Sequence, residues 1–307
     1  MSVSPSLPES IDELQRQLSS KQYVADSGLA TTIYLALKLK RPLLLEGEAG
    51  VGKTEVAKVM SAVLETDLIR LQCYEGLDIT HAVYEWNYAR QLIEIRVAER
   101  DGIHSDNRGK QVRELFSPDF LIERPLLKAI RNGADRPPVL LIDELDRADE
   151  EFEGYLLELL SDFQVTIPEL GTIKAIEPPI VIITSNRTRE LHDALKRRCL
   201  YTWIDYPDFE KELRIVTTKV PGVSASLAEQ VTRFVQELRR AELYKATGIS
   251  ETLDWIAALV ALDQEELDAT IIERTLGIVL KNQEDIQSMS NNRIQEMLNR
   301  AKAPGSR

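Results

Sequence analysis

The spacing of glycines, a lysine and a threonine early in the chain is the strongest chemical signal in the sequence. Residues 47–54 read GEAGVGKT and match the pattern G-x-x-x-x-G-K-[ST]. Glycines let the backbone turn its N–H groups onto phosphate oxygens, and the following helix directs its N-terminal dipole at the same anion. Lys53 is expected to reach the β- and γ-phosphates and Thr54 to place its hydroxyl on Mg2+. The predicted nucleotide-binding residues of this segment are Gly47, Glu48, Ala49, Gly50, Val51, Gly52, Lys53, Thr54 and Glu55.

Two carboxylates follow an apolar segment and offer the other half of this chemistry. Residues 139–142 read VLLI, and Asp143 and Glu144 come next. Ligands gather at the carboxyl ends of strands in α/β sheets. Asp143 is expected to hold Mg2+, through water, and Glu144 to orient and polarise the attacking water, because phosphoryl transfer depends on positioning and charge stabilisation. The alternative is an ordinary helix start, where acidic residues are favourable; the upstream phosphate loop favours the catalytic interpretation.

A second apolar strand and a later basic run add two further candidates. Residues 180–186 read IVIITSN, so an amide ends this strand. Asn186 is expected to orient the water or to sense the γ-phosphate, although it can also cap the turn that follows. Arg197 and Arg198 precede the last predicted strand, and an arginine can act on transition-state charge in a neighbouring chain. Taken alone, a solvated basic helix end is the simpler interpretation of these arginines.

The composition is that of an ordinary globular protein with an acidic charge. The 307 residues indicate one large domain and a smaller one. Lys and Arg number 38 against 50 Asp and Glu, and the resulting charge of −12 makes nucleic acid an unfavourable partner. Cys73 and Cys199 form no CxxC pair, which predicts reduced thiols and no zinc site. We find neither a signal peptide nor a membrane span, and a cytoplasmic location is expected.

The elements that must position these residues alternate between short apolar strands and helices. Such a pattern predicts an α/β core in which a five-stranded parallel sheet lies between helices. The strands are expected at 42–45, 68–73, 139–142, 180–184 and 201–204, with helices from Ser10-x-x-Glu13 onward and at 27–39, 53–64 and 150–160, and a hairpin at 164–178.

After Pro207 the pattern changes to helices alone. The predicted domains are therefore an N-terminal segment 1–21, a nucleotide-binding domain 22–207 and an all-α lid domain with a polar tail at 208–307. Ser226 and Ser250 are expected to cap two of the lid helices. The tail beyond Lys281 is polar, and we expect it to be loosely attached.

Residues 74–125 are expected to form an insertion with an exposed polar loop at 101–107. Its aromatic run, Tyr84 to Tyr88, can either grip a client at a central pore or pack the insertion on the core; packing is the commoner use of such residues.

The order of these motifs resembles the AAA+ ATPases over residues 22 to about 280. GEAGVGKT, VLLIDE, ITSN and ALKRRC occur in that order before an all-helical segment. The hairpin at 164–178 and the segment LDIT at 77–80 resemble the insertions of the MoxR branch. Within it the chain is similar to the CoxD-like accessory ATPases of aerobic carbon monoxide dehydrogenase and related molybdenum hydroxylases, through EGLDIT at 75–80 and WIDYP at 203–207.

This resemblance implies a ring, expected to be a hexamer, with nucleotide between subunits. It makes Arg198, and secondarily Arg197, the arginine finger, and it puts Tyr23 and Val24 near the adenine. It implies a partner with a von Willebrand factor A domain and ATP-driven maturation of a client metalloenzyme. One departure is that residues 248–255, GISETLDW, lack the arginine that the family carries at the start of a lid helix. The alternative functions are a nucleotide-dependent scaffold with little turnover and a nucleic-acid motor, against which the acidic charge counts.

Overall fold

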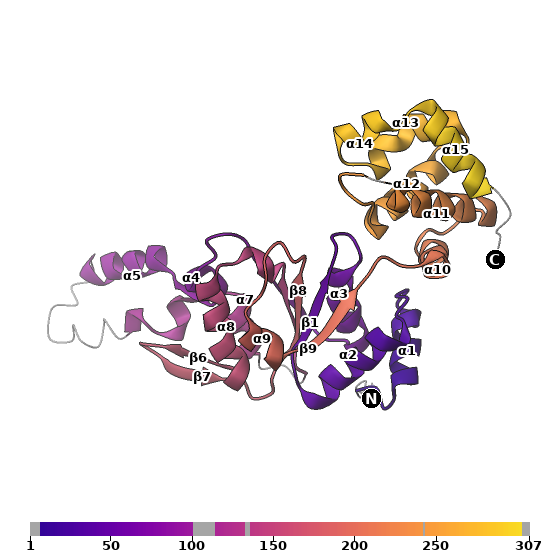
Figure 1. Ribbon diagram of the computed structural model, residues 1–307. Helices are drawn as coiled ribbons and strands as arrows, with labels where there is room; N and C mark the ends of the chain where they lie inside the picture. The colour runs from indigo at the N-terminus through magenta and orange to yellow at the C-terminus, as the bar shows by residue number, and fades with distance from the viewer. Residues whose placement is uncertain (1–6, 101–113, 133–135, 242, 303–307) are drawn as a thin grey trace. The chain divides into compact units, whose positions relative to one another are not determined.

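The computed structural model describes residues 7–100, 114–132, 136–241 and 243–302, and Figure 1 traces the order of the elements. The chain forms two compact units. The first comprises 1–11, 28–46 and 57–202, and the second comprises 12–27, 47–56 and 203–307. The phosphate loop thus belongs to the second unit, although it leaves a strand of the first. The domain limits inferred from sequence stay a prediction.

The predicted five-stranded parallel sheet is confirmed. Its strands, in spatial order, are β2 (Leu68–Gln72), β5 (Val139–Asp143), β8 (Ile180–Ser185), β1 (Leu43–Gly47) and β9 (Leu200–Ile204). All residues of β1 and β5 are buried, as expected of strands covered on both faces. Parallel register pairs Glu46 with Ser185 and Gln72 with Asp143. The carboxyl ends of these strands therefore lie at one edge.

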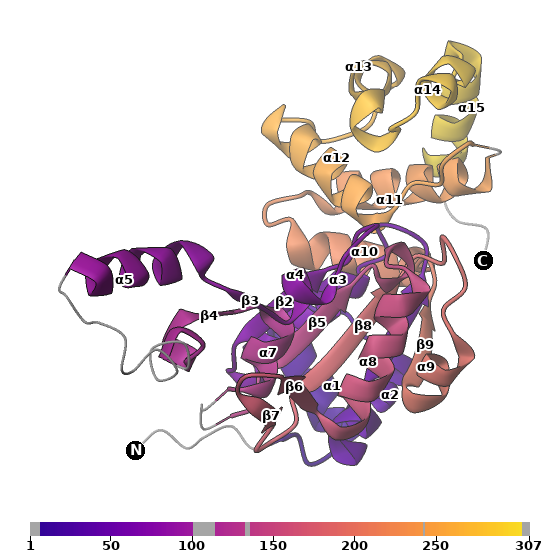
Figure 2. The same ribbon diagram turned by 90° about the vertical axis from the view of Figure 1, so that its left-hand side faces the viewer.

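Helices cover both faces of this sheet. Figure 2 shows α7 (Pro125–Ile130) and α8 (Glu150–Asp162) in front of it, and α2 (Ser27–Leu39) and α3 (Lys53–Leu64) behind it. Right-handed crossovers between parallel strands produce this division. Alternate strand residues, among them Leu44, Leu140 and Ile142, form one core with Leu127 of α7 and Leu156 of α8.

An insertion follows β2. It contains α4 (Ile79–Ala82), β3 (Tyr84–Trp86), α5 (Tyr88–Arg100), the 3-10 helix η1 (Pro118–Phe120) and β4 (Leu121–Glu123), with β3 antiparallel to β4. Trp86 is buried, and its ring lies edge-on to that of Phe116 with centroids 5.1 Å apart. Trp86 belongs to the hydrophobic core of the first unit, which supports the packing interpretation of this side chain; the pore alternative for the aromatic run stays a prediction. The polar loop predicted at 101–107 lies outside the described residues.

The elements between β5 and β9 are short. They are the 3-10 helix η2 (Leu145–Arg147), the hairpin strands β6 (Gln164–Ile167) and β7 (Gly171–Lys174), and α9 (Asp193–Arg198). The hairpin lies where the alternating pattern predicted it, and Gly171 has the positive φ of 82° that favours glycine.

The C-terminal helices build a second core around Trp255 and Phe234. They are α10 (Phe209–Lys219), α11 (Ala225–Arg240), α12 (Ile249–Ala261), α13 (Ala269–Val279), α14 (Gln283–Ser288) and α15 (Asn291–Lys302). A further helix, α1 (Ile11–Ser20), lies near the start of the chain. The expected loose tail is wrong, because Ile294 and Leu298 of α15 are buried in this core. Their spacing of four residues forms an apolar stripe within a polar segment.

Two predicted helix caps are also wrong. Ser224, not Ser226, caps α11, and its hydroxyl accepts a hydrogen bond from the Leu227 N–H at 3.1 Å. Gly248, not Ser250, caps α12. In both cases the helix starts two residues earlier than the serine pattern indicated.

Candidate functional site

The phosphate loop joins β1 to α3, and its shape depends on glycine. Gly50 and Gly52 have φ values of 79° and 94°, in the left-handed region that other residues rarely adopt. Gly47 is needed for a different reason, because a Cβ there would lie 2.1 Å from the carbonyl oxygen of Ile204. β9 thus passes directly against the start of the loop.

Lys53 is the first residue of α3, and its side chain is buried within the loop. Its Nζ donates hydrogen bonds to the carbonyl oxygens of Gly47 and Glu48, at 2.7 and 2.6 Å. The side chain is held among backbone groups of the loop, which keeps a positive charge at the N-terminus of α3. Thr54 follows within the first turn of the helix. Both features suit an anion with several oxygens.

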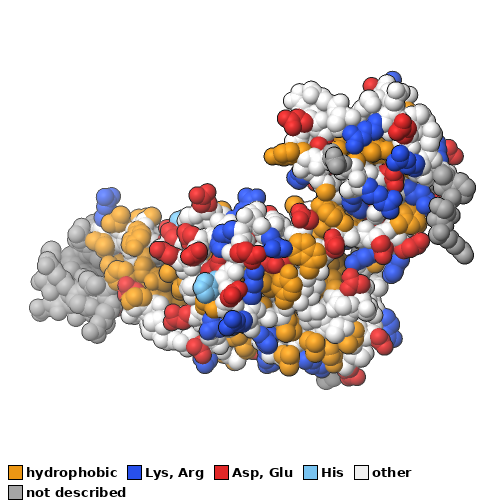
Figure 3. Space-filling model, viewed as in Figure 1, with side chains coloured by type: hydrophobic (Ala, Val, Ile, Leu, Met, Phe, Trp, Pro, Cys, Tyr) orange, Lys and Arg blue, Asp and Glu red, His pale blue; other side chains and the backbone are white. Residues whose placement is uncertain are grey.

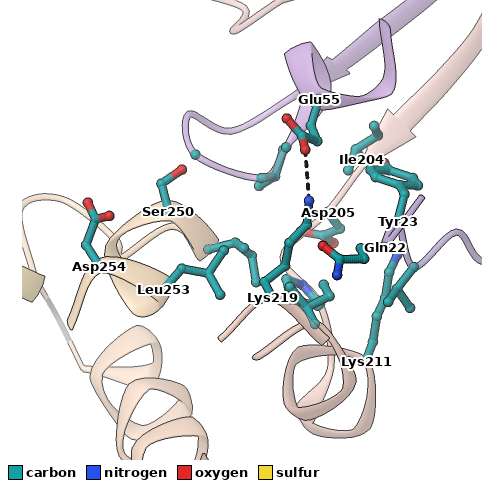
Figure 4. Close-up of a pocket in the computed structure, with 17 residues that line it drawn as sticks. Gln22, Tyr23, Glu55, Ile204, Asp205, Lys211, Lys219, Ser250, Leu253 and Asp254 are labelled. Carbon is teal, nitrogen blue, oxygen red and sulfur yellow. Dashed lines mark hydrogen bonds and ion pairs between the residues drawn. The ribbon is translucent and has the colours of Figure 1, made fainter. Parts of the chain in front are cut away.

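A pocket of about 320 Å³ lies beside this loop (Figure 4). Six of the predicted nucleotide-binding residues line it: Tyr23, Val24, Gly50, Val51, Gly52 and Glu55. The other walls come from β9, from α10 through Lys211, Ile215 and Lys219, and from the first turns of α12 through Ser250 and Leu253. Gly47, Glu48, Ala49, Lys53 and Thr54 belong to the loop next to it. The pocket therefore offers apolar walls adjacent to a cationic loop.

Two lysines of α10 line this pocket, and each forms an ion pair with a carboxylate. Lys219 Nζ lies 2.9 Å from Glu55 Oε1, the contact dashed in Figure 4, and Lys211 Nζ lies 2.8 Å from Asp26 Oδ2. Burial, followed by the carboxylates of Asp26 and Glu55, raises the pKa of the Tyr23 phenol. Tyr23 therefore stays neutral where it lines the pocket.

In the first unit, Asp143 ends β5 with its carboxylate buried at 2% exposure. The hydroxyl of Thr184 donates to Oδ1 at 2.6 Å, and the Arg70 guanidinium donates to Oδ2 at 2.6 Å. The same Thr184 oxygen accepts the N–H of Glu144 at 2.9 Å. One hydroxyl from β8 thus fixes both consecutive acidic residues at the end of β5.

Glu144 turns the chain out of the sheet in a left-handed conformation, with φ 55° and ψ 51°. Such strain in a residue with a side chain is tolerated mainly where it positions something. Its carboxylate accepts Gln72 Nε2 at 3.1 Å and Asn186 Nδ2 at 3.4 Å, and it pairs with Arg147 Nε at 3.0 Å. The structure therefore brings the predicted Glu144 and Asn186 together.

Asp146 ties this acidic turn to the segment after β8. Its buried carboxylate accepts the backbone N–H groups of Asn186 and Thr188, at 3.1 and 2.9 Å, and the Thr188 hydroxyl at 2.7 Å. Burial raises the pKa of Asp146, but the hydrogen bonds from Thr188 and Asn186 together outweigh it and lower the pKa overall. A charged Asp146 thus holds Asn186 in place.

Arg197 and Arg198 end α9, and both side chains are exposed. Their backbone carbonyl oxygens accept hydrogen bonds from Arg41, at 2.7 Å for Arg197 and 3.1 Å for Arg198. Arg41 therefore fixes the backbone from which both side chains project.

Residues 42–199, slightly more than half of the chain, match a family described as the AAA domain (dynein-related subfamily). The chain belongs to this AAA family. It is an ATPase, and ATP with Mg2+ is its predicted cofactor.

The similarity to known proteins extends beyond residues 42–199. A Staphylococcus haemolyticus protein is 26% identical over 281 residues, covering 88% of this chain and 96% of its own length. The gas vesicle ATPase GvpN of Haloferax mediterranei is 27% identical over 237 residues, covering 71% of this chain and 65% of GvpN. Among solved structures, a RuvB variant of Thermotoga maritima has a TM-score of 0.48 and 17% identity, covering 92% of this chain and 76% of that one.

The residues of the AAA domain fit this cofactor. Carboxylate and hydroxyl oxygens, as on Asp143 and Thr54, are ligands that Mg2+ prefers, and a glycine-shaped loop with a lysine suits a triphosphate. None of the helices in the described part of the chain is both long and apolar enough to span a membrane.

Sequence reasoning missed Arg70, Gln72, Thr184 and Asp146. Arg70 and Gln72 stand two residues apart on the edge strand β2, where polar side chains are ordinarily solvent-facing. Thr184 interrupts an apolar strand just before its end, and this was the one signal that could have identified it.

Proposed function

We propose that this AAA domain hydrolyses ATP at the carboxyl edge of its sheet. From the sequence motifs we propose that Lys53 and the loop N–H groups bind the phosphates, that Tyr23 and Val24 contact the adenine, and that Thr54 and Asp143 are the ligands of the metal ion. Bound Mg2+ would neutralise part of the negative charge on the phosphates. Glu144 polarises the attacking water, and the Asn186 amide keeps the Glu144 carboxylate in position. The observation that carries this proposal is the hydroxyl of Thr184 between Asp143 and Glu144.

We infer that the active assembly is a ring, with six subunits, in which Arg198 acts on the nucleotide of its neighbour. AAA ATPases typically oligomerise. Exposure of Arg198 at the end of α9, on a backbone fixed by Arg41, supports a role outside its own chain. Arg197 is the second candidate, since it is equally exposed.

The work done by hydrolysis is proposed to be remodelling of a client protein in the cytoplasm. The resemblance to the MoxR branch supports this. From the resemblance to the CoxD-like group we propose that the client is a molybdenum hydroxylase of the carbon monoxide dehydrogenase type and that a von Willebrand factor A protein is a partner. The exposed apolar side chains of α5 support the proposal of a partner; they are Tyr88, Leu92, Ile93 and Val97. Figure 3 shows hydrophobic side chains gathered over this helix.

Glu144→Gln tests the enzymatic part. The variant should bind ATP like the wild type but release phosphate at least about 100-fold more slowly, because general-base catalysis contributes 10²–10⁴-fold. Wild-type turnover would remove Glu144 from the reaction. Arg198→Ala should bind ATP and lose turnover, and mixing it with excess Lys53→Ala subunits should restore part of the activity if the arginine acts between chains.

The client proposal needs a separate experiment. Glu144→Gln, loaded with ATP, should retain the client hydroxylase during purification, whereas Lys53→Ala should not. Cells that lack the gene should produce the hydroxylase with an incomplete metal centre. Normal metal content and activity of the hydroxylase in such cells would refute the maturation role and leave the ATPase assignment intact.

A further inference from the structure

Two glycines from distant parts of the sequence lie against each other in the second unit. A Cβ on Gly248 would be 2.9 Å from the Cα of Gly50 and 3.1 Å from its carbonyl oxygen. The N–H of Ile249, the first residue of α12, donates a hydrogen bond to that same oxygen at 2.9 Å. The backbone at the start of α12 therefore contacts the backbone of the phosphate loop directly.

Space, and not backbone conformation, requires glycine at position 248. Its φ of −81° and ψ of 174° are open to any residue. A methyl group there would meet Gly50, and it would also lie 2.7 Å from Glu251 Oε2. Gly50 differs, because its φ of 79° already favours glycine. The space at position 248 therefore admits only glycine where the start of α12 approaches the loop.

Arg239 of α11 holds the turn that presents Gly248. Its Nε donates to the carbonyl oxygen of Thr247 at 2.7 Å, and its two Nη atoms donate to the Glu212 carboxylate at 2.5 and 2.7 Å. The Glu212 side chain is fully buried and that of Arg239 is 8% exposed. Thr252 of α12 also donates to Glu212, at 2.9 Å. One ion pair therefore links α10, α11 and α12 at the residue before Gly248.

The same network holds the chain that leads from the sheet to α10. Gln236 Nε2 donates to Glu212 at 2.7 Å and to the carbonyl oxygen of Pro207 at 3.1 Å. The Arg239 guanidinium lies over the Tyr206 ring, 5.1 Å from its centroid. Buried ion pairs are often no more stabilising than apolar residues of similar volume. A network of this size is therefore better explained by the geometry that it fixes than by stability alone.

We propose that Arg239 is a positioning residue for ATP binding, which it serves by holding Gly248 against Gly50 so that α12 sets the conformation of the phosphate loop. This inference rests on the proposed nucleotide site. Neither Arg239 nor Gly248 lines the pocket. Weakening their contact is expected to lower ATP affinity without removing any group that touches the nucleotide.

Gly248→Ala in the full chain tests the contact directly. The equilibrium dissociation constant of Mg-ATP should rise about tenfold or more, where tenfold corresponds to about 1.4 kcal/mol. Gly277→Ala is the matched control, because a Cβ at that position in α13 meets nothing within 4 Å; its ATP affinity should equal that of the wild type. Wild-type affinity in Gly248→Ala would overturn the proposal.

Arg239→Lys tests the positioning role without removing the charge. A lysine can pair with Glu212 but lacks the planar fork that reaches Thr247 at the same time. ATP affinity should fall severalfold at a temperature well below the measured Tm of the variant. Arg233→Lys is the control, because Arg233 lies on the same helix and pairs with the exposed Glu229. A lowered Tm with unchanged ATP affinity would make Arg239 purely structural and sink the inference.

Lys53→Ala separates this inference from the proposed site. Loss of ATP binding in Lys53→Ala, with unchanged affinity in Gly248→Ala and Arg239→Lys, would refute the inference alone. Normal ATP binding in Lys53→Ala would refute the proposed site itself.

Discussion

Thr184→Val should slow ATP hydrolysis although Thr184 is not expected to touch the substrate. Valine has nearly the same shape, so the substitution removes one hydroxyl from a side chain that is 1% exposed. That hydroxyl donates to Asp143 at 2.6 Å and accepts the N–H of Glu144 at 2.9 Å. A hydrogen bond to a charged group contributes roughly 1.5–3 kcal/mol, and an orphaned buried donor costs roughly 1–3 kcal/mol.

These two effects share one oxygen, so we expect a combined loss of about 3 kcal/mol rather than their full sum. Part of it should appear as reduced stability in urea unfolding, measured from the midpoint at constant m-value. Part should appear as a fall in kcat of about 10- to 100-fold, since each tenfold corresponds to about 1.4 kcal/mol. The kcat is to be measured by steady-state phosphate release at saturating Mg-ATP.

Two controls make the result specific. Thr184→Ser keeps the hydroxyl and should retain most of the turnover. Thr166→Val removes an exposed hydroxyl from β6, which contacts only Thr172 at 3.0 Å among the hydrogen bonds of described side chains, and it should change neither quantity. If Thr184→Val matched Thr184→Ser in both kcat and stability, the two-sided role of the hydroxyl would be wrong. If it lost stability alone, Thr184 would not position the carboxylates.

Three further predictions concern other residues of the first unit. Burial, followed by neighbouring carboxylates, raises the pKa of Cys73 to about 12, and burial raises that of Cys199 to about 12; both thiols should resist iodoacetamide at pH 8 and react fully after denaturation. The pKa of Asp146 is lowered by folding, so its contribution to stability is present at neutral pH and is lost as pH falls through the folded pKa. The stability gap between wild type and Asp146→Asn, measured by urea unfolding, should therefore shrink below about pH 4. Trp86→Ala should cost about 3–5 kcal/mol of stability, whereas Tyr88→Ala, at an exposed position, should leave the urea midpoint unchanged.

The sequence predicted those parts of the site that local patterns encode. The phosphate loop has fixed spacing, and the acidic and amide residues directly follow apolar strands, so Asp143, Glu144 and Asn186 could be named as candidates without a structure. Arg70 could not, because its role comes from register: Gln72 pairs with Asp143 across β2 and β5, which sets Arg70 two residues back on the same strand. Register between distant segments leaves no mark in either segment alone.

The errors in the helical region have a related cause. Ser224 and Ser226 are both plausible caps, and the choice depends on which one has an extended backbone before the first turn. The polar composition of α15 suggested a loose tail, but Ile294, Met297, Leu298 and Ala301 are buried and α15 packs on α11. Propensity is a weak guide where packing decides the outcome.

The proposed contact between Gly248 and Gly50 offers a physical explanation for the absence of an arginine at residues 248–255. An arginine there would respond to phosphate charge, and salt would screen it. A backbone hydrogen bond from Ile249 to Gly50 responds instead to the shape of the loop. If Arg239 holds that contact, coupling between α12 and the nucleotide should depend little on ionic strength. The effect of Gly248→Ala on ATP affinity should then be similar at low and high salt, in contrast to any contact made by a charged side chain.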